Sequence, residues 1–492
     1  MKLNSRCDRS EVAPFVDGAL TASGSRNTAD VVNPSNGQRN FVIPAGCLGD
    51  VDAAVSSARR AFESGGWSAA PPSLRKKILH CFADLIALES RAFDALDAEE
   101  MGKPISERFA NAQAASELMG FYAEGLDKSV GDVYTCDKAS FVAQRFVPRG
   151  VVAAIVPWNF PTYASVLKLA PALAAGNSVV LKPSELSTRS AIRLAEVGIE
   201  AGLPLGVLNV VPGLGEIVGR ALALHSDVDM VTFTGSTEVG KLVLQFAGQS
   251  NMKLVMAECG GKSAHIVFDD GVNLQSVADN VATMLVTNQG QICSVGSRLV
   301  VQRSIESKLL EMILVRIDQI KVGDALDPNT TFGPLASAKQ CSRVMEFIEG
   351  ARSDGAKLVK GGRRLLEETG GYFIEPTVFG SVVPSSRLAQ EEIFGPVLSV
   401  MSFDDEVEAI EIANGTQYGL AAYVWTCDLS RGMRMVKSLR SSVRVNTGVC
   451  TGEGAGYAAS HEPARQSGIG CEGGLTGMES YLRRQRIWFS HA

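Results

Sequence analysis

The middle of the chain alternates between two kinds of segment. Continuous apolar runs rich in Val and Ile occupy residues 151–156, 178–181, 207–211, 230–233 and 254–257. Helix-like stretches separate them, at about 164–175, 187–201, 217–224 and 237–246. Uninterrupted apolar strands alternating with helices are typical of a parallel sheet that is covered on both faces. We therefore predict a doubly wound α/β sheet over residues 150–260.

A second alternation follows between residue 263 and about residue 446. Strands are predicted near 264–268, 299–302, 397–402 and 421–425, with helices between them, the clearest at 274–286. This pattern predicts a second α/β domain. The first 120 residues are mostly helical in pattern after Gly49 and need not form an independent unit.

Two extended segments with alternating polar positions, 141–148 and 486–490, lie far apart in the sequence. Such strands often pair with each other or with a partner subunit. They could equally be ordinary edge strands, and the sequence leaves the choice open.

Composition narrows the class of protein. The chain has 492 residues, 46% hydrophobic, with 47 Lys and Arg against 53 Asp and Glu. A nucleic-acid binder usually has a basic surplus, so nucleic acid is not an expected partner. No run approaches the roughly 18 apolar residues of a membrane-spanning helix. A membrane is therefore not an expected partner either. The N-terminus is polar, without an export signal, and we expect a cytoplasmic protein with reduced thiols.

The ten cysteines and five histidines are scattered. There is no C-x-x-C and no H-x-x-x-H pattern, so we predict no metal site.

Candidate chemistry gathers where strands end. Asn159, held between Pro157 and Pro161, could donate to an oxyanion or could simply cap a turn. Lys182 and Glu185 could hold a ribose or form a solvated ion pair. A carboxylate would repel a 2′-phosphate, so Glu185 favours NAD over NADP.

Further candidates follow along the chain. Gly235 and Ser236 open a helix whose amides could bind a pyrophosphate, although many strand–helix turns use Gly and Ser for geometry alone. A desolvated Glu258 would have a raised pKa and could act as a general base. Cys293 lies in a turn rich in Gly and amides, where an exposed thiolate could be stabilised by backbone dipoles. Its alternative is a structural cysteine. Glu391, Glu392 and Phe394 stand just before Gly395 and Pro396, and they could form a turn without any chemical role.

Six short motifs stand together in one order: P-W-N-F-P at 157–161, K-P-S-E at 182–185, F-T-G-S-x-x-x-G at 233–240, E-x-G-G-K-S at 258–263, N-x-G-Q-x-C at 288–293 and E-E-x-F-G-P at 391–396. In the order and spacing of these six motifs, the sequence resembles the NAD(P)-dependent aldehyde dehydrogenase superfamily over about residues 33–489. Within it, three further segments look like bacterial enzymes that act on aminoaldehydes and γ-glutamylamino aldehydes.

The resemblance implies a fold of three parts. These are a Rossmann-like cofactor domain (1–128 and 149–258), a catalytic α/β domain (259–471) and a small β-arm for oligomerisation (129–148 and 472–492). It implies a homodimer or homotetramer and NAD as the cofactor.

It also implies roles for single residues. Cys293 matches the nucleophile, Glu258 the general base, and Asn159 the oxyanion donor together with the main-chain N–H of Cys293. The thiolate would attack the aldehyde carbon, hydride would pass to NAD, and water activated by Glu258 would hydrolyse the thioester. The residues matching the cofactor contacts are Trp158, Lys182, Ser184, Glu185, Gly235, Ser236, Glu392 and Phe394.

The sequence departs from the family pattern near the substrate. Residues 460–465 read S-H-E-P-A-R where members usually have P-F-G-G-x-K, and Leu167 stands where many aminoaldehyde enzymes have Trp. We interpret residues 111–119 as lacking the acidic side chains that would meet an amino group, whereas an ammonium substrate favours anionic or aromatic walls. We therefore expect a neutral, bulky or aromatic aldehyde.

The substrate tunnel is predicted from Phe121, Tyr122, Tyr163 and Leu167, although these aromatics could equally be core residues. Two alternatives remain: an aminoaldehyde or semialdehyde dehydrogenase, and a non-catalytic nucleotide-binding member of the family.

Overall fold

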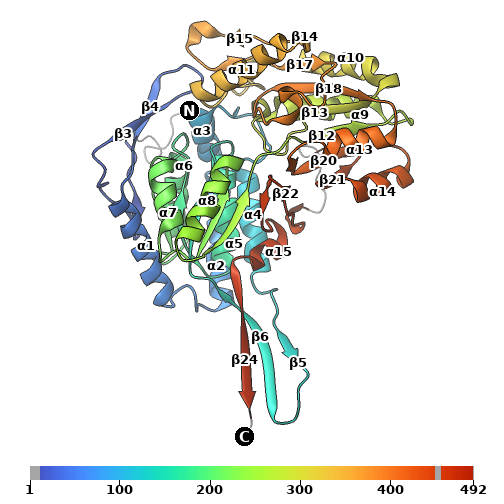
Figure 1. Ribbon diagram of the computed structural model, residues 1–492. Coiled ribbons are helices and arrows are strands. Elements are labelled where there is room, and N and C mark those ends of the chain that lie inside the picture. The colour runs from blue at the N-terminus through green and yellow to red at the C-terminus, as the bar shows by residue number, and fades with distance from the viewer. Residues whose placement is uncertain (1–10, 449–455, 491–492) are drawn as a thin grey trace.

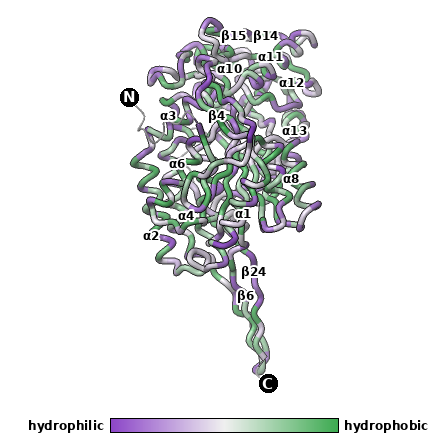
Figure 2. The backbone as a smooth tube through the Cα atoms, turned by 90° about the vertical axis from the view of Figure 1, so that its left-hand side faces the viewer, coloured by the Kyte–Doolittle hydropathy of each residue, from purple (hydrophilic) through white to green (hydrophobic). Residues whose placement is uncertain are grey.

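The computed structural model describes residues 11–448 and 456–490. The outermost predicted domain limits, at residues 1–10 and 491–492, lie outside them, as do Cys7 and Cys450. Figure 1 shows two lobes, each built on a sheet, and a narrow arm extending away from them. The view turned by 90° in Figure 2 shows the same arm standing clear of both lobes. The predicted α/β class is confirmed.

The first lobe contains an eight-stranded sheet in the described part of the chain. In spatial order its strands are β2 (Ala19–Leu20), β1 (Phe15–Val16), β9 (Leu208–Val210), β8 (Ser178–Lys182), β7 (Val151–Ile155), β10 (Met230–Thr234), β11 (Leu254–Glu258) and β23 (Gly468–Ile469). The strands from β9 to β11 are parallel, and the edge pairings of β1 and β23 are antiparallel. Sequence order reverses between β7 and β10, and such a switch point is where doubly wound sheets bind ligands.

Helices cover both faces of this sheet because its strands are apolar on both sides. In β7, Val152 and Ala154 join one core cluster, while Val151, Ala153 and Ile155 join another. One face carries α2 (Pro72–Leu88), α4 (Ala112–Gly125), α5 (Pro161–Ala174) and α6 (Arg189–Glu200). The other carries α1 (Leu48–Glu63), α7 (Arg220–Leu224) and α8 (Thr237–Gln249). Near them lie α3 (Ser90–Met101) and the hairpin of β3 (Thr28–Val32) and β4 (Arg39–Pro44).

The second lobe has a seven-stranded sheet within the described residues. Its spatial order is β14 (Lys357–Lys360), β17 (Thr377–Gly380), β18 (Val397–Phe403), β13 (Arg298–Gln302), β12 (Ala264–Val267), β20 (Ala421–Trp425) and β21 (Ser442–Val445). Its helices are α9 (Leu274–Val286), α10 (Glu306–Ile317), α11 (Ala338–Ser353), α12 (Arg387–Gln390), α13 (Glu406–Asn414) and α14 (Leu429–Ser438). The pairs β15 (Arg364–Leu365) with β16 (Phe373–Ile374) and β19 (Tyr418–Gly419) with β22 (Ala464–Arg465) lie outside the main sheets.

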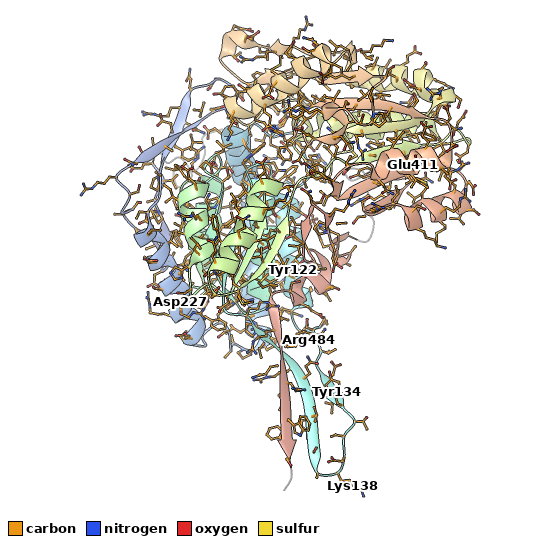
Figure 3. All side chains as sticks on the ribbon, in the orientation of Figure 1. Tyr122, Tyr134, Lys138, Asp227, Glu411 and Arg484 are labelled. Atoms are coloured by element: carbon orange, nitrogen blue, oxygen red, sulfur yellow. The ribbon has the colours of Figure 1, made fainter. Side chains whose placement is uncertain are left out.

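The arm consists of β5 (Asp132–Tyr134), β6 (Ser140–Pro148) and β24 (Leu482–Ser490). β24 pairs antiparallel with β6 along its whole length, from Leu482 opposite Pro148 to Ser490 opposite Ser140. The two extended segments therefore pair with each other, one of the alternatives that the sequence left open. Figure 3 places Tyr134 and Lys138 on this arm, away from both lobes.

Candidate active site

Two consecutive glycines bring three loops together just after β11. An added Cβ at Gly260 would lie 2.2 Å from a carboxylate oxygen of Glu392, and one at Gly261 would lie 2.5 Å from the carbonyl oxygen of Cys293. The Gly261 amide also donates to the Glu392 carboxylate at 3.0 Å. Only glycine leaves room for such backbone approaches. The double glycine therefore brings the Glu258, Cys293 and Glu392 loops together.

Cys293 follows the short helix η2 (Thr287–Gly290) and is half-buried. Burial raises the pKa of its thiol to about 12, and the nearby carboxylates of Glu258 and Glu392 add to that rise. The backbone amide of Ser294 acts in the opposite direction and is outweighed. Burial and the nearby carboxylates therefore favour the neutral thiol, and the dipole-stabilised thiolate stays a prediction.

Asn159 is tied to the loop that carries Cys293. Its buried side-chain amide donates to the carbonyl of Gln291 at 2.9 Å, and Asn288 donates to the carbonyl of Asn159 at 2.7 Å. A carboxamide has two N–H donors, so one remains beyond the bond to Gln291. The end of β7 thus holds a polar donor against the cysteine loop.

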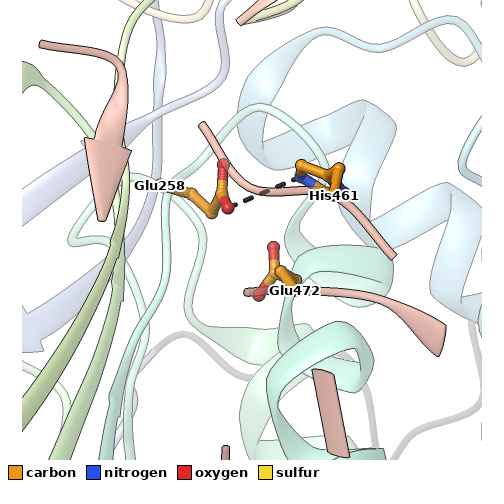
Figure 4. Close-up of side chains that lie close together, drawn as sticks. All are labelled: Glu258, His461 and Glu472. Atoms are coloured by element: carbon orange, nitrogen blue, oxygen red, sulfur yellow. Dashed lines mark ion pairs between the residues drawn. The ribbon is translucent and has the colours of Figure 1, made fainter. Parts of the chain in front are cut away.

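Glu258 ends β11 at the centre of a small charged cluster (Figure 4). Its Oε1 lies 3.5 Å from Nε2 of His461. Beside them, Glu472 forms a buried ion pair with Lys168 of α5. Burial raises the pKa of Glu258, and the hydrogen bond from His461 opposes that rise. The raised pKa expected for this carboxyl group is confirmed.

A buried ammonium and a half-exposed carboxylate lie together at the end of β8. Lys182 Nζ donates to the carbonyl of Pro183 at 2.7 Å and lies 3.8 Å from the carboxylate of Glu185. Burial lowers the pKa of Lys182. Ser184, in contrast, accepts a bond from the Leu186 amide within the turn. A donor beside an acceptor suits the vicinal hydroxyls of a ribose.

The turn after β10 has spare hydrogen-bonding capacity. Ser236 caps α8 by accepting from the Val239 amide at 3.3 Å, and Gly235 precedes it. The Thr234 hydroxyl beside them is buried without a hydrogen-bond partner among the described residues. The first amides of a helix also lack partners within it and favour anions. These groups fit the pyrophosphate of a dinucleotide at the switch point.

Trp158 lies after β7 of the first lobe and Phe394 lies before β18 of the second lobe, and their side chains are in contact. Their ring centroids lie 5.2 Å apart at right angles. The Phe394 backbone has a left-handed φ of 58°, and its carbonyl accepts from Gln340 at 2.7 Å. Burial raises the pKa of neighbouring Glu392 to about 7. The structure therefore gathers these three predicted cofactor residues on one side of the cysteine loop.

The predicted tunnel residues occupy two environments. Phe121, Tyr163 and Leu167 are half-buried beside the core of the first lobe, whereas Tyr122 is fully buried within it. Figure 3 also shows Tyr122 inside this lobe. Phe121 contacts Tyr122 with a centroid separation of 5.1 Å. Three of the four thus form a half-exposed apolar wall, and their role as a tunnel stays a prediction.

Two groups near this wall were missed by the sequence analysis. The Tyr457 hydroxyl lies 3.2 Å from the exposed carboxylate of Glu117, and its ring lies 6.3 Å from that of Phe121. The interpretation that residues 111–119 lack an acidic side chain is therefore wrong, because Glu117 lies in that segment and its carboxylate is exposed beside this wall. No local pattern pairs it with Tyr457, which is 340 residues away.

His461 was also missed as a partner of Glu258. The unusual composition of residues 460–465 was the available signal. Among the described residues, Glu258, His461 and Glu472 form the one group of such side chains close enough to share a metal ion, with ligand atoms within 4.8 Å. The Lys168 ammonium already supplies a positive charge against Glu472. Within the same residues, no helix is long and apolar enough to cross a bilayer.

Fold and site together define an α/β protein that presents a cysteine and a carboxylate near the switch point of its first sheet. The chain belongs to the aldehyde dehydrogenase family, whose model matches residues 20–487. It is 42% identical to the NADP/NAD-dependent aldehyde dehydrogenase PuuC of Escherichia coli, over 97% of this chain and 95% of that protein.

Solved structures of other aldehyde dehydrogenases are similar to this chain in both fold and sequence. The P. syringae indole-3-acetaldehyde dehydrogenase AldA, a mutant in complex with NAD+ and IAA, matches with a TM-score of 0.95 and 43% identity over 99% of this chain and 98% of that one. The gamma-glutamyl-gamma-aminobutyraldehyde dehydrogenase of Burkholderia cenocepacia matches with a TM-score of 0.94 and 42% identity over 98% and 97%.

Proposed function

We propose that this NAD-dependent aldehyde dehydrogenase oxidises its aldehyde through a covalent intermediate on Cys293, which water activated by Glu258 then hydrolyses. The observation that carries the proposal is the packing of the Glu258 loop on the Cys293 loop through Gly261. This packing puts a carboxyl group of raised pKa close enough to affect the thiol. A nucleophile and a base in one buried site are what acylation followed by hydrolysis requires.

Each residue has a defined task in this proposal. The Cys293 thiol gives its proton to water, and the sulfur then attacks the carbonyl carbon. The free amide hydrogen of Asn159 and the main-chain N–H of Cys293 hold the resulting oxyanion. Glu258 later takes a proton from water, whose oxygen attacks the thioester carbon and releases the acid. Bound NAD supplies the hydride acceptor.

We assign the adenosine ribose to Lys182 and Glu185, and the pyrophosphate to Gly235, Ser236 and the start of α8. Ser184 contributes by shaping the turn, and Glu392, Phe394 and Trp158 lie on the nicotinamide side. The relative PuuC is described as NADP/NAD-dependent, so both cofactors need testing. The half-exposed Glu185 carboxylate supports a preference for NAD, because it would repel a ribose phosphate.

Glu185→Ala is expected to increase the ratio of kcat/KM for NADP to that for NAD by about tenfold, equivalent to about 1.4 kcal/mol. The change removes the negative charge that would face the phosphate and one acceptor for the ribose hydroxyls. Steady-state kinetics with both cofactors measure the ratio. Glu411→Ala on α13, an exposed acid of the other lobe (Figure 3), is the matched control. An unchanged ratio would show that the ribose lies elsewhere.

The substrate we propose is a neutral, bulky or aromatic aldehyde. The half-exposed wall of Phe121, Tyr163, Leu167 and Tyr457 supports this class. The similarity to an indole-3-acetaldehyde dehydrogenase agrees with it. The carboxylate of Glu117 at the Tyr457 hydroxyl favours a second candidate, an aminoaldehyde, as the names of other relatives also suggest.

NADH formation with phenylacetaldehyde and with aminobutanal separates the two candidates. We expect kcat/KM to be at least about tenfold higher for phenylacetaldehyde, because its ring buries apolar surface against the wall. Glu117→Gln should then change neither value by more than about twofold, since exposed charges contribute little. A preference for aminobutanal that Glu117→Gln abolishes would instead establish the second candidate.

We also propose that the arm assembles this chain into a homodimer or homotetramer. Large apolar side chains lie exposed on it, namely Val133, Tyr134, Phe141, Trp488 and Phe489. Clustered exposed apolar groups of this kind mark association surfaces. The division into a cofactor domain (1–128 and 149–258), a catalytic domain (259–471) and the arm (129–148 and 472–492) is part of the same proposal. The cytoplasmic location stays a prediction.

A further inference from the structure

The 460–465 segment places an imidazole between the general base and solvent. His461 Nε2 lies 3.5 Å from Glu258 Oε1, and the side chains are 41% and 11% exposed respectively. The His461 backbone is fixed by two hydrogen bonds with Glu472, of 2.8 and 2.9 Å. A short antiparallel bridge therefore fixes the backbone that carries the imidazole.

The charged surroundings of His461 come from three elements. Glu258 faces it from the end of β11, Lys168 from α5, and Glu472 from the residues before α15 (Gly474–Glu479). Glu472 is engaged by Lys168 in a buried ion pair. The Cys471 thiol, next in sequence to Glu472, is affected by the same carboxylates. Two carboxyl groups and one ammonium group therefore surround the imidazole.

The proposed reaction creates a proton that must leave the site. When Glu258 takes a proton from water, the hydroxide oxygen bonds to the thioester carbon and the carbon–sulfur bond breaks. Glu258 then carries one proton, and it must release this proton before it can act as a base again. Its side chain has little contact with solvent.

We propose that His461 is the proton exit of Glu258. In the neutral imidazole with its proton on Nδ1, the lone pair of Nε2 takes the Glu258 carboxyl proton, and the Nδ1 proton of the resulting imidazolium passes to solvent water. Proton exchange with solvent then restores the starting tautomer, so no proton is gained or lost over the cycle. His461 acts through Glu258 and does not touch the substrate, so it is a positioning and relay residue. The inference rests on the proposed role of Glu258 as the base.

The electrostatics of the pair favour transfer in this direction. Contact with Glu258 raises the pKa of His461, whereas the hydrogen bond from His461 opposes the rise that burial causes in the pKa of Glu258. Both effects favour a proton on the imidazole over a proton on the carboxylate. Family members with Phe at this position, by the motif given above, have no such group there.

The test compares His461→Ala with the wild type in full-length protein. The pre-steady-state burst of NADH should be unchanged, because hydride transfer precedes hydrolysis. Steady-state turnover should fall at least about tenfold, and its acidic limb should move to higher pH because Glu258 loses the partner that opposes its raised pKa. Added imidazole should restore turnover in a concentration-dependent way, and a chelator should have no effect.

The matched control is His80→Gln, which removes an imidazole paired with Glu124 on the exposed surface. It should change none of these values. If His461→Ala keeps the wild-type turnover and pH profile, or loses turnover without a pH shift or imidazole rescue, the relay is wrong and His461 is structural at most.

A readout independent of activity separates this inference from the proposed function. In wild-type protein with labelled histidine, NMR should show one imidazole with a raised pKa that is absent from His461→Ala. This pKa should fall in Glu258→Gln. An unshifted imidazole would overturn the relay even in an active enzyme. Absence of both burst and turnover in a wild type with the shifted imidazole would overturn the proposed function, and with it the relay.

Discussion

Cys293→Ala is expected to abolish NADH formation with every aldehyde, by at least about 10⁴-fold in kcat. Without sulfur no covalent adduct forms, and neither Asn159 nor Glu258 can replace the nucleophile. The measurement is NADH absorbance under saturating aldehyde and cofactor. Cofactor binding, followed by quenching of tryptophan fluorescence, should survive, because the residues assigned to the ribose and pyrophosphate lie on other loops.

Cys427→Ala is the control for this experiment, because Cys427 is an exposed thiol in the second lobe. It should keep wild-type turnover. Turnover retained in Cys293→Ala would contradict the proposed chemistry. A wild type that binds NAD but oxidises no aldehyde would instead favour the non-catalytic alternative.

Glu258→Gln is expected to lower steady-state turnover by about 10²- to 10⁴-fold and to leave a burst of one NADH per site. Glutamine keeps the shape of glutamate and cannot take a proton from water, so the acyl-enzyme should accumulate. Mass spectrometry of the quenched protein should show the added acyl mass on Cys293. Glu411→Gln, an exposed acid on α13, should behave like the wild type.

The same variant tests the electrostatic origin of the raised pKa of the Cys293 thiol. Glu258 is the first of three carboxylates that raise the pKa of Cys293, so iodoacetamide should label Cys293 faster in Glu258→Gln. In the wild type, the raised pKa of Glu258 means that the base is lost as pH falls through a value above that of an ordinary glutamate. Hydrolysis should therefore fail at a higher pH than for a solvated glutamate. Loss of the burst together with turnover would contradict a role confined to hydrolysis.

The sequence predicted the sheets well where the physical signal is local. β7, β8 and β10 are continuous apolar runs, and α9 begins after the capping side chain of Asn273 and follows the predicted 274–286 range. The helix predicted at 217–224 differs, since it opens with a π-helical turn at Gly215–Gly219. A bulge of that kind leaves no mark in the spacing of apolar residues.

The sequence motifs predicted which residues are candidates for the site, but not the environment of those residues in the folded protein. Motif order identified Cys293, Glu258 and Asn159 as candidates, but not the pKa of the thiol, because burial and neighbouring charge depend on the folded arrangement. The contact between Glu258 and His461 joins residues far apart in sequence, and no periodicity encodes such a pair. Likewise, the pairing of β6 with β24 was left open because a strand pattern does not name its partner.

The buried ion pair of Lys168 and Glu472 also bears on how the molecule acquires its shape. These residues are separated by 304 positions, as are Asn177 and the Tyr481 carbonyl to which it donates. Contacts of such long range carry a large loop-closure entropy and form slowly. The central strands of the first sheet, from β9 to β11, pair across shorter separations, whereas the surroundings of Glu258 need residues 461–472. We therefore expect catalytic competence to arise late in folding, after these strands have paired.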